Sequence, residues 1–354
     1  MGEKAISAEG VAEKDRMNED NLDAWMRENV EGFAGLAAYS KFSDGQSNPT
    51  YRVEDQAGNT FVLRRKPFGD LLPSAHQVER EYRAIAALHP VGYPVAKPFA
   101  LCEDDSVVGS AFYIMDLVDG RVLWDGMLPG MEPTERTSIY KAMIGTLARL
   151  HNLDYKEIGL ERHGKPGNYF ERQVHTWTKL YRMAETETIP EVEKLIEWLP
   201  TTVPEQTRTS VIHGDYRLDN MIFHSDRPEV AAVLDWELST IGDPLADFTY
   251  LAQNWVMHGE GGSALADHDL TGTGVPTLEE ATELYCELTD RDSIPDMNWY
   301  FSYNMFRLTG IIQGIKKRWL DGTASSAEAE ERSKRVPELA EASWEFARAA
   351  GAPA

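Results

Sequence analysis

The sequence predicts an α+β chain of two lobes, in which an antiparallel sheet with one main helix precedes a mostly helical lobe. Three observations support this fold class. Residues 36–66 have the alternating apolar pattern of paired strands. Residues 134–153 carry apolar side chains at intervals of three and four, as a core helix does. Between the helices of the second lobe, residues 211–248 combine a polar loop with a second hairpin pattern.

Composition and charge limit the classes of partner. The chain has 354 residues, of which 42% are hydrophobic, enough material for two lobes. It contains no apolar run of bilayer-spanning length, and residues 1–20 lack the apolar core of a signal peptide, so we expect a cytoplasmic protein. The formal net charge of −23 repels nucleic acid and anionic membranes, so neither is expected as a partner. The oligomeric state is not specified by the sequence.

The central stretch, residues 211–248, is predicted to form a loop followed by a hairpin. Two short apolar runs, 221–223 and 230–234, are strand-like, and the segment before them, 213–220, is polar. The stretch therefore places polar side chains at the ends of strands, where a rigid scaffold can aim them into one cleft.

Three side chains of this stretch are suited to phosphoryl transfer: Asp215, Asn220 and Asp235. An aspartate can orient and deprotonate a hydroxyl, while an amide and a second carboxylate supply hard oxygen ligands for magnesium bound to nucleotide phosphates. Turn residues alone would also explain such side chains. The joint pattern of His-Gly-Asp, the asparagine five residues later, Asp-Trp and then Gly-Asp-Pro favours the catalytic interpretation.

At this point the sequence resembles the aminoglycoside phosphotransferase family, the small-molecule branch of the protein-kinase-like fold. Within that branch it is most similar to the kinase-like domains found beside, or fused to, acyl-CoA dehydrogenases. The runs FSDGQSNPTYRV, FVLRRKP, LLPSAHQVEREYRAIAAL and PGNYFERQVHTWTKLY carry this narrower resemblance, which covers about residues 42–320. The resemblance implies a bilobal kinase fold with ATP and Mg²⁺ as cofactors.

Three segments follow from the patterns and the resemblance together. Residues 1–20 are expected to be a mobile N-terminus. Residues 21–117 form the nucleotide-binding lobe, which begins with an amphipathic helix. Residues 118–354 form the helical lobe with the catalytic loop and the substrate pocket. Its charged tail, residues 325–347, is expected to be a peripheral helix.

The strand that ends at residues 64–66 departs from the family. By register, Arg64 stands where the family places a lysine on the nucleotide phosphates. The period of two puts Lys66 on the same face, so Lys66 remains the alternative, and Arg65 on the opposite face reads as a solvated basic residue. The resemblance also places the small polar loop with Ser47 and Asn48 over the phosphates, where backbone amides would approach them.

The helix predicted over residues 74–88 carries the acidic partner of this strand. A capping-box signal begins at Ser74. By resemblance, Glu81 pairs with the basic residue of the strand and orders it for phosphate contact, with Glu79 as runner-up. Arg80 is expected to point away from the buried stripe.

The strand AFYIMDLVDG resembles the hinge that joins the lobes. In such folds the adenine is bound mainly by backbone groups, so Asp116 and Val118 would act through their main chains. Met115 would form part of the pocket wall.

The remaining implied roles belong to the second lobe. By resemblance, Asp243 and Asp247 brace the backbone of the catalytic loop without taking part in the chemistry. His213 is expected to support the loop backbone. Late basic residues form the only cluster suited to a CoA groove: Arg307, Lys316, Lys317 and Arg318.

The reaction predicted from these residues is transfer of the γ-phosphoryl group of ATP to a small-molecule hydroxyl. Asp215 would take the proton of the hydroxyl, while Asn220 and Asp235 would hold magnesium on the phosphates. Arg217, two residues after the base, would add positive charge at the site, and a salt bridge on the loop surface is its alternative.

The acceptor stays open at this stage. The narrower resemblance points to hydroxyacyl-CoA or hydroxy-acid substrates. The acidic composition would suit an aminoglycoside or another amino-alcohol. A catalytically silent nucleotide-binding regulator is the third hypothesis, because arginine replaces lysine at position 64.

Overall fold

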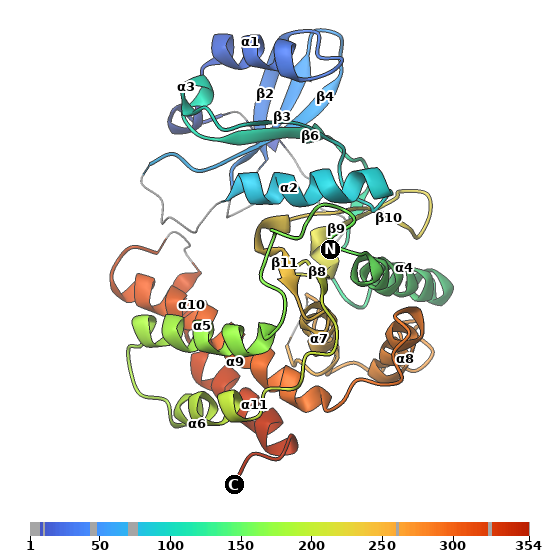
Figure 1. Ribbon diagram of the computed structural model, residues 1–354, viewed down its shortest axis with the longest axis vertical. Coiled ribbons are helices and arrows are strands. Elements are labelled where there is room, and N and C mark those ends of the chain that lie inside the picture. The colour runs from blue at the N-terminus through green and yellow to red at the C-terminus, as the bar shows by residue number, and fades with distance from the viewer. Residues whose placement is uncertain are drawn as a thin grey trace.

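The computed structural model describes residues 8–9, 11–42, 48–69, 77–259, 262–324 and 328–353. It is an α+β structure with an antiparallel sheet in its N-terminal region and a mostly helical C-terminal region, as predicted (Figure 1). We call residues 8–116 the sheet part and residues 133–353 the helical part.

Six strands form one antiparallel sheet in the order β1-β2-β3-β4-β6-β5. They are β1 (Ala8–Glu9), β2 (Leu36–Phe42), β3 (Thr50–Asp55), β4 (Thr60–Arg65), β5 (Pro98–Cys102) and β6 (Phe112–Asp116). The β3–β4 hairpin turns at Gly58, whose φ of +87° suits glycine. Thr50 lies opposite Arg64 in this hairpin, so the register of β4 is fixed on both sides, by β3 and by β6.

The two faces of this sheet are covered by different helices. On one face, α1 (Glu19–Asn29) and α3 (Asp105–Val108) pack over side chains that alternate along the strands. These side chains are Tyr51, Val53, Phe61, Leu63, Phe112 and Ile114. The other face carries α2 (Val78–Leu88), which Figure 1 shows between the sheet and the helical part. Because strand side chains alternate, Arg64 faces α2 and Arg65 faces α1.

A short link joins the two parts. After β6 the chain enters β7 (Arg121–Val122), which pairs with β9 (Met221–Phe223), and β9 pairs with β10 (Val230–Val233). A Cβ at Gly120 would lie 2.2 Å from the Phe223 carbonyl oxygen, so this close crossing requires glycine. A separate pair, β8 (Ser210–Ile212) and β11 (Thr240–Gly242), flanks the catalytic loop.

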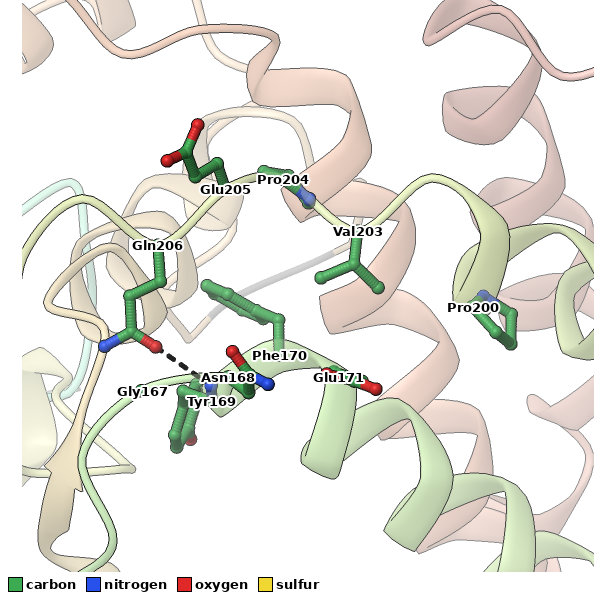
Figure 2. Close-up of a pocket in the computed structure, with 10 residues that line it drawn as sticks. All are labelled: Gly167, Asn168, Tyr169, Phe170, Glu171, Pro200, Val203, Pro204, Glu205 and Gln206. Carbon is green, nitrogen blue, oxygen red and sulfur yellow. Dashed lines mark hydrogen bonds between the residues drawn. The ribbon is translucent and has the colours of Figure 1, made fainter.

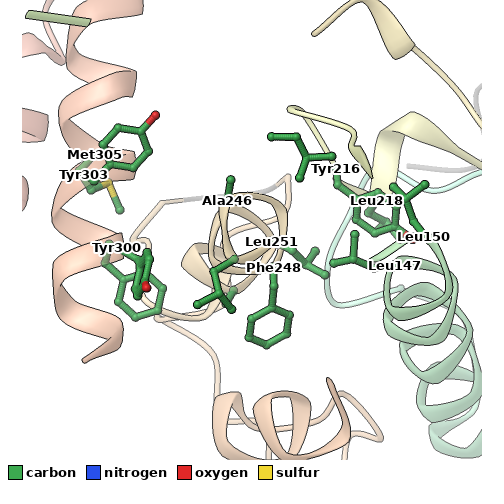
Figure 3. Packing of buried hydrophobic residues seen from close by; sticks show 14 of the residues in the cluster. Leu147, Leu150, Tyr216, Leu218, Ala246, Phe248, Leu251, Tyr300, Tyr303 and Met305 are labelled. Atoms are coloured by element: carbon green, nitrogen blue, oxygen red, sulfur yellow. The ribbon is translucent and has the colours of Figure 1, made fainter. Parts of the chain in front are cut away.

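The helical part is built around α9. Its helices are α4 (Pro133–Asn152), α5 (Tyr169–Ala184), α6 (Pro190–Trp198), α7 (Leu245–Ala252), α8 (Leu278–Leu288), α9 (Met297–Leu320), α10 (Ala329–Ser333) and α11 (Val336–Ala349). Short 3₁₀ helices are η1 (Glu13–Asp15), η2 (His89–Val91), η3 (Leu199–Thr201), η4 (Leu218–Asn220), η5 (Trp236–Leu238) and η6 (Gln253–Trp255). Figure 3 shows α7 between α4 and α9, with Phe248 and Leu251 in their shared core. This packing fixes the position of α7 under the catalytic loop.

Most predicted elements are present at the expected positions, including the hairpin of the central stretch. Three expectations are wrong. The sequence pattern of residues 244–257 predicts one continuous helix, but α7 ends at Ala252 and the chain continues as a 3₁₀ turn. The tail is not peripheral, because α11 packs against α9 and α6 and buries Ser343 completely. In the terminal segment expected to be mobile, Met17 is buried and Asp15 pairs with Lys41 of β2. The cap expected at Ser74 lies outside the described residues.

Candidate active site

The loop between β8 and β9 is held from below by a buried carboxylate of α7. Asp247 accepts hydrogen bonds from the backbone amides of His213 (2.6 Å) and Gly214 (2.7 Å). Its Oδ2 also lies 3.4 Å from Nε2 of His151. Burial raises the pKa of Asp247, but His151 and the backbone amides outweigh burial and hold this pKa below its ordinary value. The contacts of Asp247 are therefore those of the expected brace.

Asp243 does not share this role. Its carboxylate accepts a hydrogen bond from the backbone amide of Leu245 (2.9 Å), at the start of α7. Burial raises the pKa of Asp243 to about 6. The expectation that Asp243 braces the loop is wrong: among its hydrogen bonds to described residues, none reaches residues 213–220.

His213 supports the loop through both of its ring nitrogens. Nδ1 lies 3.2 Å from the backbone amide of Asp215, and Nε2 lies 2.7 Å from the carbonyl oxygen of Leu234. One tautomer satisfies both contacts, with a proton on Nε2 that is donated to Leu234 and with Nδ1 accepting from Asp215. The ring thus ties the loop to the end of β10, as expected for a residue that supports the backbone.

Asp215 and Asn220 are joined directly. Nδ2 of Asn220 donates to the main-chain oxygen and to Oδ2 of Asp215, at 2.9 Å each. Because both partners are acceptors, the amide nitrogen must face Asp215, and Oδ1 of Asn220 faces away from it. The Asp215 side chain is 21% exposed, so a ligand can reach the remaining carboxylate oxygen.

Asp235 lies beside Asn220 because of the hairpin. The backbone amide of Leu234 donates to the carbonyl oxygen of Asn220 (2.8 Å). Asp235 then adopts a left-handed conformation, with φ of 64° and ψ of 63°, which aspartate tolerates better than most residues. The turn leaves its carboxylate 31% exposed and directed toward the sheet part.

Arg64 crosses from the sheet part to this carboxylate. Its Nη2 lies 2.7 Å from Oδ1 of Asp235, and its Nε lies 2.9 Å from Oε2 of Glu81. Glu81 is almost fully buried, and burial raises its pKa to about 7 against the opposing charge of Arg64. The predicted pairing of Arg64 with Glu81 is therefore present in the structure, and it continues to Asp235.

The two neighbouring basic residues lie elsewhere. Lys66 shares the strand face of Arg64, as expected, but its ammonium pairs with Glu79. Arg65 was expected to be solvated and is instead fully buried on the α1 face. Its Nη2 donates to the Tyr51 hydroxyl (2.8 Å), and its guanidinium stacks 3.5 Å from the centre of the Phe68 ring. The expectation failed because Asp15 of η1, 3.7 Å from Nη2, and the Phe68 ring lie against the guanidinium.

Arg217 forms ion pairs within the loop. Its Nε lies 3.3 Å from Oδ2 of Asp215, and its Nη2 lies 3.2 Å from Asp219. The side chain is 45% exposed. Arg217 is thus close to the predicted base, and the loop salt bridge weighed as its alternative is also formed.

The predicted hinge and phosphate-loop residues lie on the sheet part. Met115 and Asp116 end β6, and the backbone amide of Asp116 already donates to the Lys97 carbonyl (2.9 Å). An adenine contact through Asp116 would therefore use its carbonyl oxygen. Val118 lies in the link to β7. Asn48 is buried just before β3, whereas Ser47 lies outside the described residues.

The donors at Asn220 and Asp235 suit a magnesium–nucleotide. The carboxylate of Asp235 and the outward-facing Oδ1 of Asn220 are hard oxygen donors, and the two residues lie at the open end of the β9–β10 hairpin, where the Leu234 amide bonds to the Asn220 carbonyl. Within the described residues, no group of three or more histidine, cysteine, aspartate or glutamate side chains forms a metal cage. Mg²⁺ commonly uses one or two carboxylates together with substrate phosphates and water, so two protein donors fit this ion.

Sequence reasoning did not place Arg307, Tyr250 or Trp177 at the catalytic loop, and it assigned Arg307 to a late basic cluster. Arg307 of α9 donates from Nη2 to the carbonyl oxygen of Gly214 (2.8 Å). Its guanidinium lies 5.0 Å from the Tyr250 ring and 5.6 Å from the Trp177 ring. The nearby Asp215 carboxylate, together with burial, raises the pKa of Tyr250. The available signal was an arginine within an otherwise aromatic and apolar stretch of helix, residues 299–312.

The late basic residues do not form the expected groove. Arg307 faces the catalytic loop, Lys316 pairs with Glu187, and Lys317 pairs with Asp321 one turn along the helix. Their shared position in the sequence therefore does not produce one basic patch on the surface.

A cavity of about 430 Å³ lies elsewhere in the helical part. Figure 2 shows it between the start of α5 and the segment 200–206, where Gln206 accepts from the backbone amide of Tyr169 (2.9 Å). Its lining includes none of the predicted site residues. The site around Asp215 is therefore separate from this cavity.

Comparison with known proteins identifies the chain at the level of family. A model of the phosphotransferase enzyme family, APH, matches residues 38–284, more than half of the chain. The chain belongs to this family. It is a small-molecule phosphotransferase, as the resemblance implied.

Two relatives lie close in sequence. Acyl-CoA dehydrogenase family member 10 of Mus musculus is 46% identical over 313 residues, which cover 88% of this chain and 29% of that protein. The chain spans less than half the length of the curated relatives that it matches. A crystal structure from Ralstonia eutropha, named for the aminoglycoside phosphotransferases, is 48% identical with a TM-score of 0.87 and covers 94% of this chain and 99% of its own.

A more distant structure shares the fold. The amicoumacin kinase hAmiN, in complex with AMP-PNP and Ca²⁺, has a TM-score of 0.53 at 15% identity, over 93% of this chain and 94% of its own. Within the described part of the chain, no helix has the length and apolar character needed to cross a membrane.

Proposed function

We propose that the chain is an ATP- and magnesium-dependent kinase that transfers the γ-phosphoryl group to the hydroxyl of a hydroxyacyl-CoA or hydroxy acid. One observation carries the reaction class. Asn220 bonds to Asp215, the amide of Leu234 bonds to the carbonyl of Asn220, and Arg64 reaches Asp235, the next residue, from the sheet part. These contacts support the proposal that a base, two metal-competent oxygens and a phosphate-competent cation act at one site.

Asp215 acts as the base in this proposal. The carboxylate oxygen that Asn220 does not hold accepts the hydrogen bond of the acceptor hydroxyl and takes its proton late, as the hydroxyl oxygen bonds to phosphorus and the nucleoside diphosphate leaves. Asn220 keeps one carboxylate oxygen of Asp215 occupied and so fixes the direction of the other. The brace of Asp247 on the loop backbone limits the movement of the base during transfer.

Arg64 is proposed to bind the phosphates, in preference to Lys66. Glu81 holds Arg64 from behind, and only Arg64 of the two reaches Asp235. The magnesium–nucleotide would be held by Asp235 and Asn220, and when bound it supplies the phosphoryl group and neutralises charge in the transition state. Ser47, Asn48, Met115, Asp116 and Val118 would complete the nucleotide site through backbone and apolar contacts.

The proposal that the acceptor carries an acyl group is based on the names of the relatives. The curated relatives that match most of the chain are named for acyl-CoA dehydrogenases. Phosphorylation of a hydroxyl on an acyl chain would make that oxygen a good leaving group for a later step. The acidic composition would suit an aminoglycoside, but the two arginines near the base, Arg217 and Arg307, favour an acceptor without ammonium groups at this point.

The catalytically silent regulator remains a second candidate on one observation. Nη2 of Arg64 lies on Asp235, the residue that would hold the metal. A chain that kept this ion pair closed would bind nucleotide without transferring phosphate.

The test is ADP release from ATP and Mg²⁺ with a panel of hydroxyacyl-CoAs, free hydroxy acids, aminoglycosides and choline-like alcohols. We expect release with the hydroxyacyl group of acceptors and none with Asp215→Asn as the matched control. Silence with every acceptor, together with retained nucleotide binding, would favour the regulator.

A further inference from the structure

One guanidinium beside the proposed base differs from its neighbours in having no acidic partner. Arg64 pairs with Glu81 and Asp235, and Arg217 pairs with Asp215 and Asp219. Among the described residues, no carboxylate lies within ion-pair distance of Arg307.

A partly buried arginine without a direct ion pair is costly, and the carboxylate charge that acts on Arg307 is that of Asp215, the proposed base. Removing a charge from water is unfavourable unless a counter-charge or several hydrogen bonds replace the water. Arg307 has five N–H donors, and only Nη2 is used, by the carbonyl oxygen of Gly214. Among the described residues, Nε and Nη1 of Arg307 have no hydrogen-bond partner, and neither atom is enclosed by protein. Both therefore face accessible space.

The position of this space is fixed by the groups that hold the guanidinium. Tyr250 and Trp177 lie on its sides, and the hydrogen bond to Gly214 ties it to the residue before Asp215. A Cβ at Gly310 would lie 3.4 Å from the Trp177 ring, so the indole packs closely against α9. The free donors of Arg307 therefore stay near the base and cannot swing far from it.

We propose that Arg307 is a specificity residue that binds an acyl oxygen of the acceptor, either a carboxylate or a thioester carbonyl, while the acceptor hydroxyl meets Asp215. This inference rests on the proposed function and extends it by naming the residue that selects the acceptor. A planar guanidinium with two free donor directions suits an acyl oxygen, and it repels the ammonium groups of an amino-sugar.

The two helices that carry Trp177 and Arg307 also expose large apolar side chains. Leu180 and Met183 of α5 and Ile311 of α9 are exposed, and α5 packs against α9. Apolar side chains on the exposed surface of these helices are compatible with an acceptor that carries an acyl chain.

The experiment compares Arg307→Gln and Arg307→Lys with Arg318→Gln, the same change at an exposed position of the same helix. Three acceptors of equal chain length are used: a hydroxy acid, its CoA thioester, and the diol in which an alcohol replaces the acyl group. For Arg307→Gln we expect kcat/KM to fall about 10- to 100-fold with the acyl acceptors and less than about threefold with the diol. Arg307→Lys should lie between Arg307→Gln and the unaltered chain, and Arg318→Gln should match the unaltered chain.

The ratio of kcat/KM between an acyl acceptor and the diol distinguishes two effects of the substitution: loss of a contact with the acceptor, and disturbance of the catalytic loop. Loss of the Gly214 contact alone would slow all three acceptors equally and leave the ratio unchanged, and that result would overturn the inference. A fall with the hydroxy acid alone identifies a carboxylate ligand, and a fall with the thioester as well identifies a carbonyl. If the unaltered chain phosphorylates none of the three acceptors, the proposed function itself fails.

A binding measurement gives a readout that does not need turnover. Calorimetry with the hydroxy acid and with the diol should show about tenfold or more weaker binding of the acid to Arg307→Gln, with the diol unchanged. Equal binding of the acid to both proteins would contradict the role of Arg307 even if transfer were slowed.

Discussion

Two groups of charged side chains meet at Asp235, and they are held in different ways. The catalytic-loop group is fixed to backbone: Asp247 accepts from two loop amides, and Asn220 is bonded to Asp215 five residues earlier. In the second group, the Arg64 side chain bonds to the side chains of Glu81 and Asp235. Arg64 and Asp235 are 171 residues apart in the sequence. The base is therefore positioned by one compact region, whereas the contact proposed for the phosphates depends on how the sheet and helical parts are placed.

A further contact fixes that placement. Arg80 of α2 donates to the carbonyl oxygens of Ser239 and His163 in the helical part. It was expected to point away from the buried stripe, and it does so by reaching the helical part. The end of α2 that carries Glu81 is thus tied to the same region as Asp235, and Arg64 lies between them.

Removal of the base should have the largest effect. For Asp215→Asn we expect kcat to fall by about 10³-fold, since general-base catalysis typically contributes 10²- to 10⁴-fold. Nucleotide affinity should change by less than about threefold, because the contact with Arg64 is retained. Steady-state ADP release and nucleotide titration measure the two quantities. Loss of nucleotide binding with retained turnover would show that Asp215 binds the nucleotide and is not the base.

The backbone brace should be the next most sensitive position. Asp247→Asn replaces a carboxylate that accepts two backbone amides, so we expect the free energy of unfolding to fall by about 2–4 kcal/mol. Asp243→Asn, two residues before the same helix, is the matched control. It should cost less, because burial already raises the pKa of Asp243 to about 6 and its neutral form is better tolerated. Equal losses in chemical denaturation would remove the distinction between the two aspartates.

The cross-part ion pair should affect nucleotide binding and leave the fold intact. Arg64→Gln should weaken nucleotide affinity by about 10- to 100-fold, as expected for loss of charge-assisted hydrogen bonds. Arg64→Lys restores the residue of the family and should cost only a few-fold. Arg52→Gln, which removes an exposed ion pair with Glu54 on the neighbouring strand, is the control. Unchanged nucleotide affinity in Arg64→Gln would contradict phosphate binding by Arg64 and favour Lys66 as the phosphate-binding residue.

Acidification should weaken the region around His163 in the helical part, which binds Arg80 of α2. Burial lowers the pKa of His163 to about 3, so between about pH 6.5 and pH 3 the unfolded chain binds a proton that the folded chain does not. Stability contributed by neutral His163 is therefore present above pH 6.5 and is lost as the pH falls, by at most about 1.4 kcal/mol per pH unit.

Denaturation of His163→Gln across this range should show a shallower pH slope than the unaltered chain. The same change at exposed His175 should leave the slope as it is. Identical slopes in all three proteins would show that His163 does not govern the acid response.

Arg217 should have the smallest effect of the five. Its side chain is 45% exposed and shared between Asp215 and Asp219, so screening limits its contribution. For Arg217→Ala we expect kcat/KM to fall by about three- to tenfold. Unchanged catalytic efficiency would leave Arg217 as a loop salt bridge with no part in transfer.

Much of the local structure could be predicted from the sequence, because it depends on neighbours in the chain. The hairpin after Asn220 and the core helix α4 follow from apolar periods of two and of three to four. The family pattern added the pairing of Arg64 with Glu81. What failed depends on elements that are distant in sequence. Arg65 is buried on the side of the sheet that also contacts Asp15 of η1, a residue far away in sequence, and no local pattern contains that information.

The same limit explains Arg307. In the sequence it belongs to a basic stretch with Lys316, Lys317 and Arg318, and its distance of 93 residues from Gly214 conceals their contact. Parallel packing of α5 and α9 places it between Trp177 and Tyr250. Residues that choose the acceptor come from helices on either side of the loop, so the catalytic motif fixes the reaction class and leaves the substrate to tertiary structure.

The most direct test of the central claim is phosphorus NMR of the reaction of ATP, Mg²⁺ and a hydroxyacyl acceptor, with the unaltered chain and with Asp215→Asn. The account predicts a new phosphate-ester signal on the acceptor that grows in step with ADP. It also predicts no such signal with Asp215→Asn at saturating nucleotide. Formation of the ester at an equal rate by both proteins would contradict Asp215 as the base. Saturated nucleotide binding by the unaltered chain without ester on any acceptor would contradict the kinase itself.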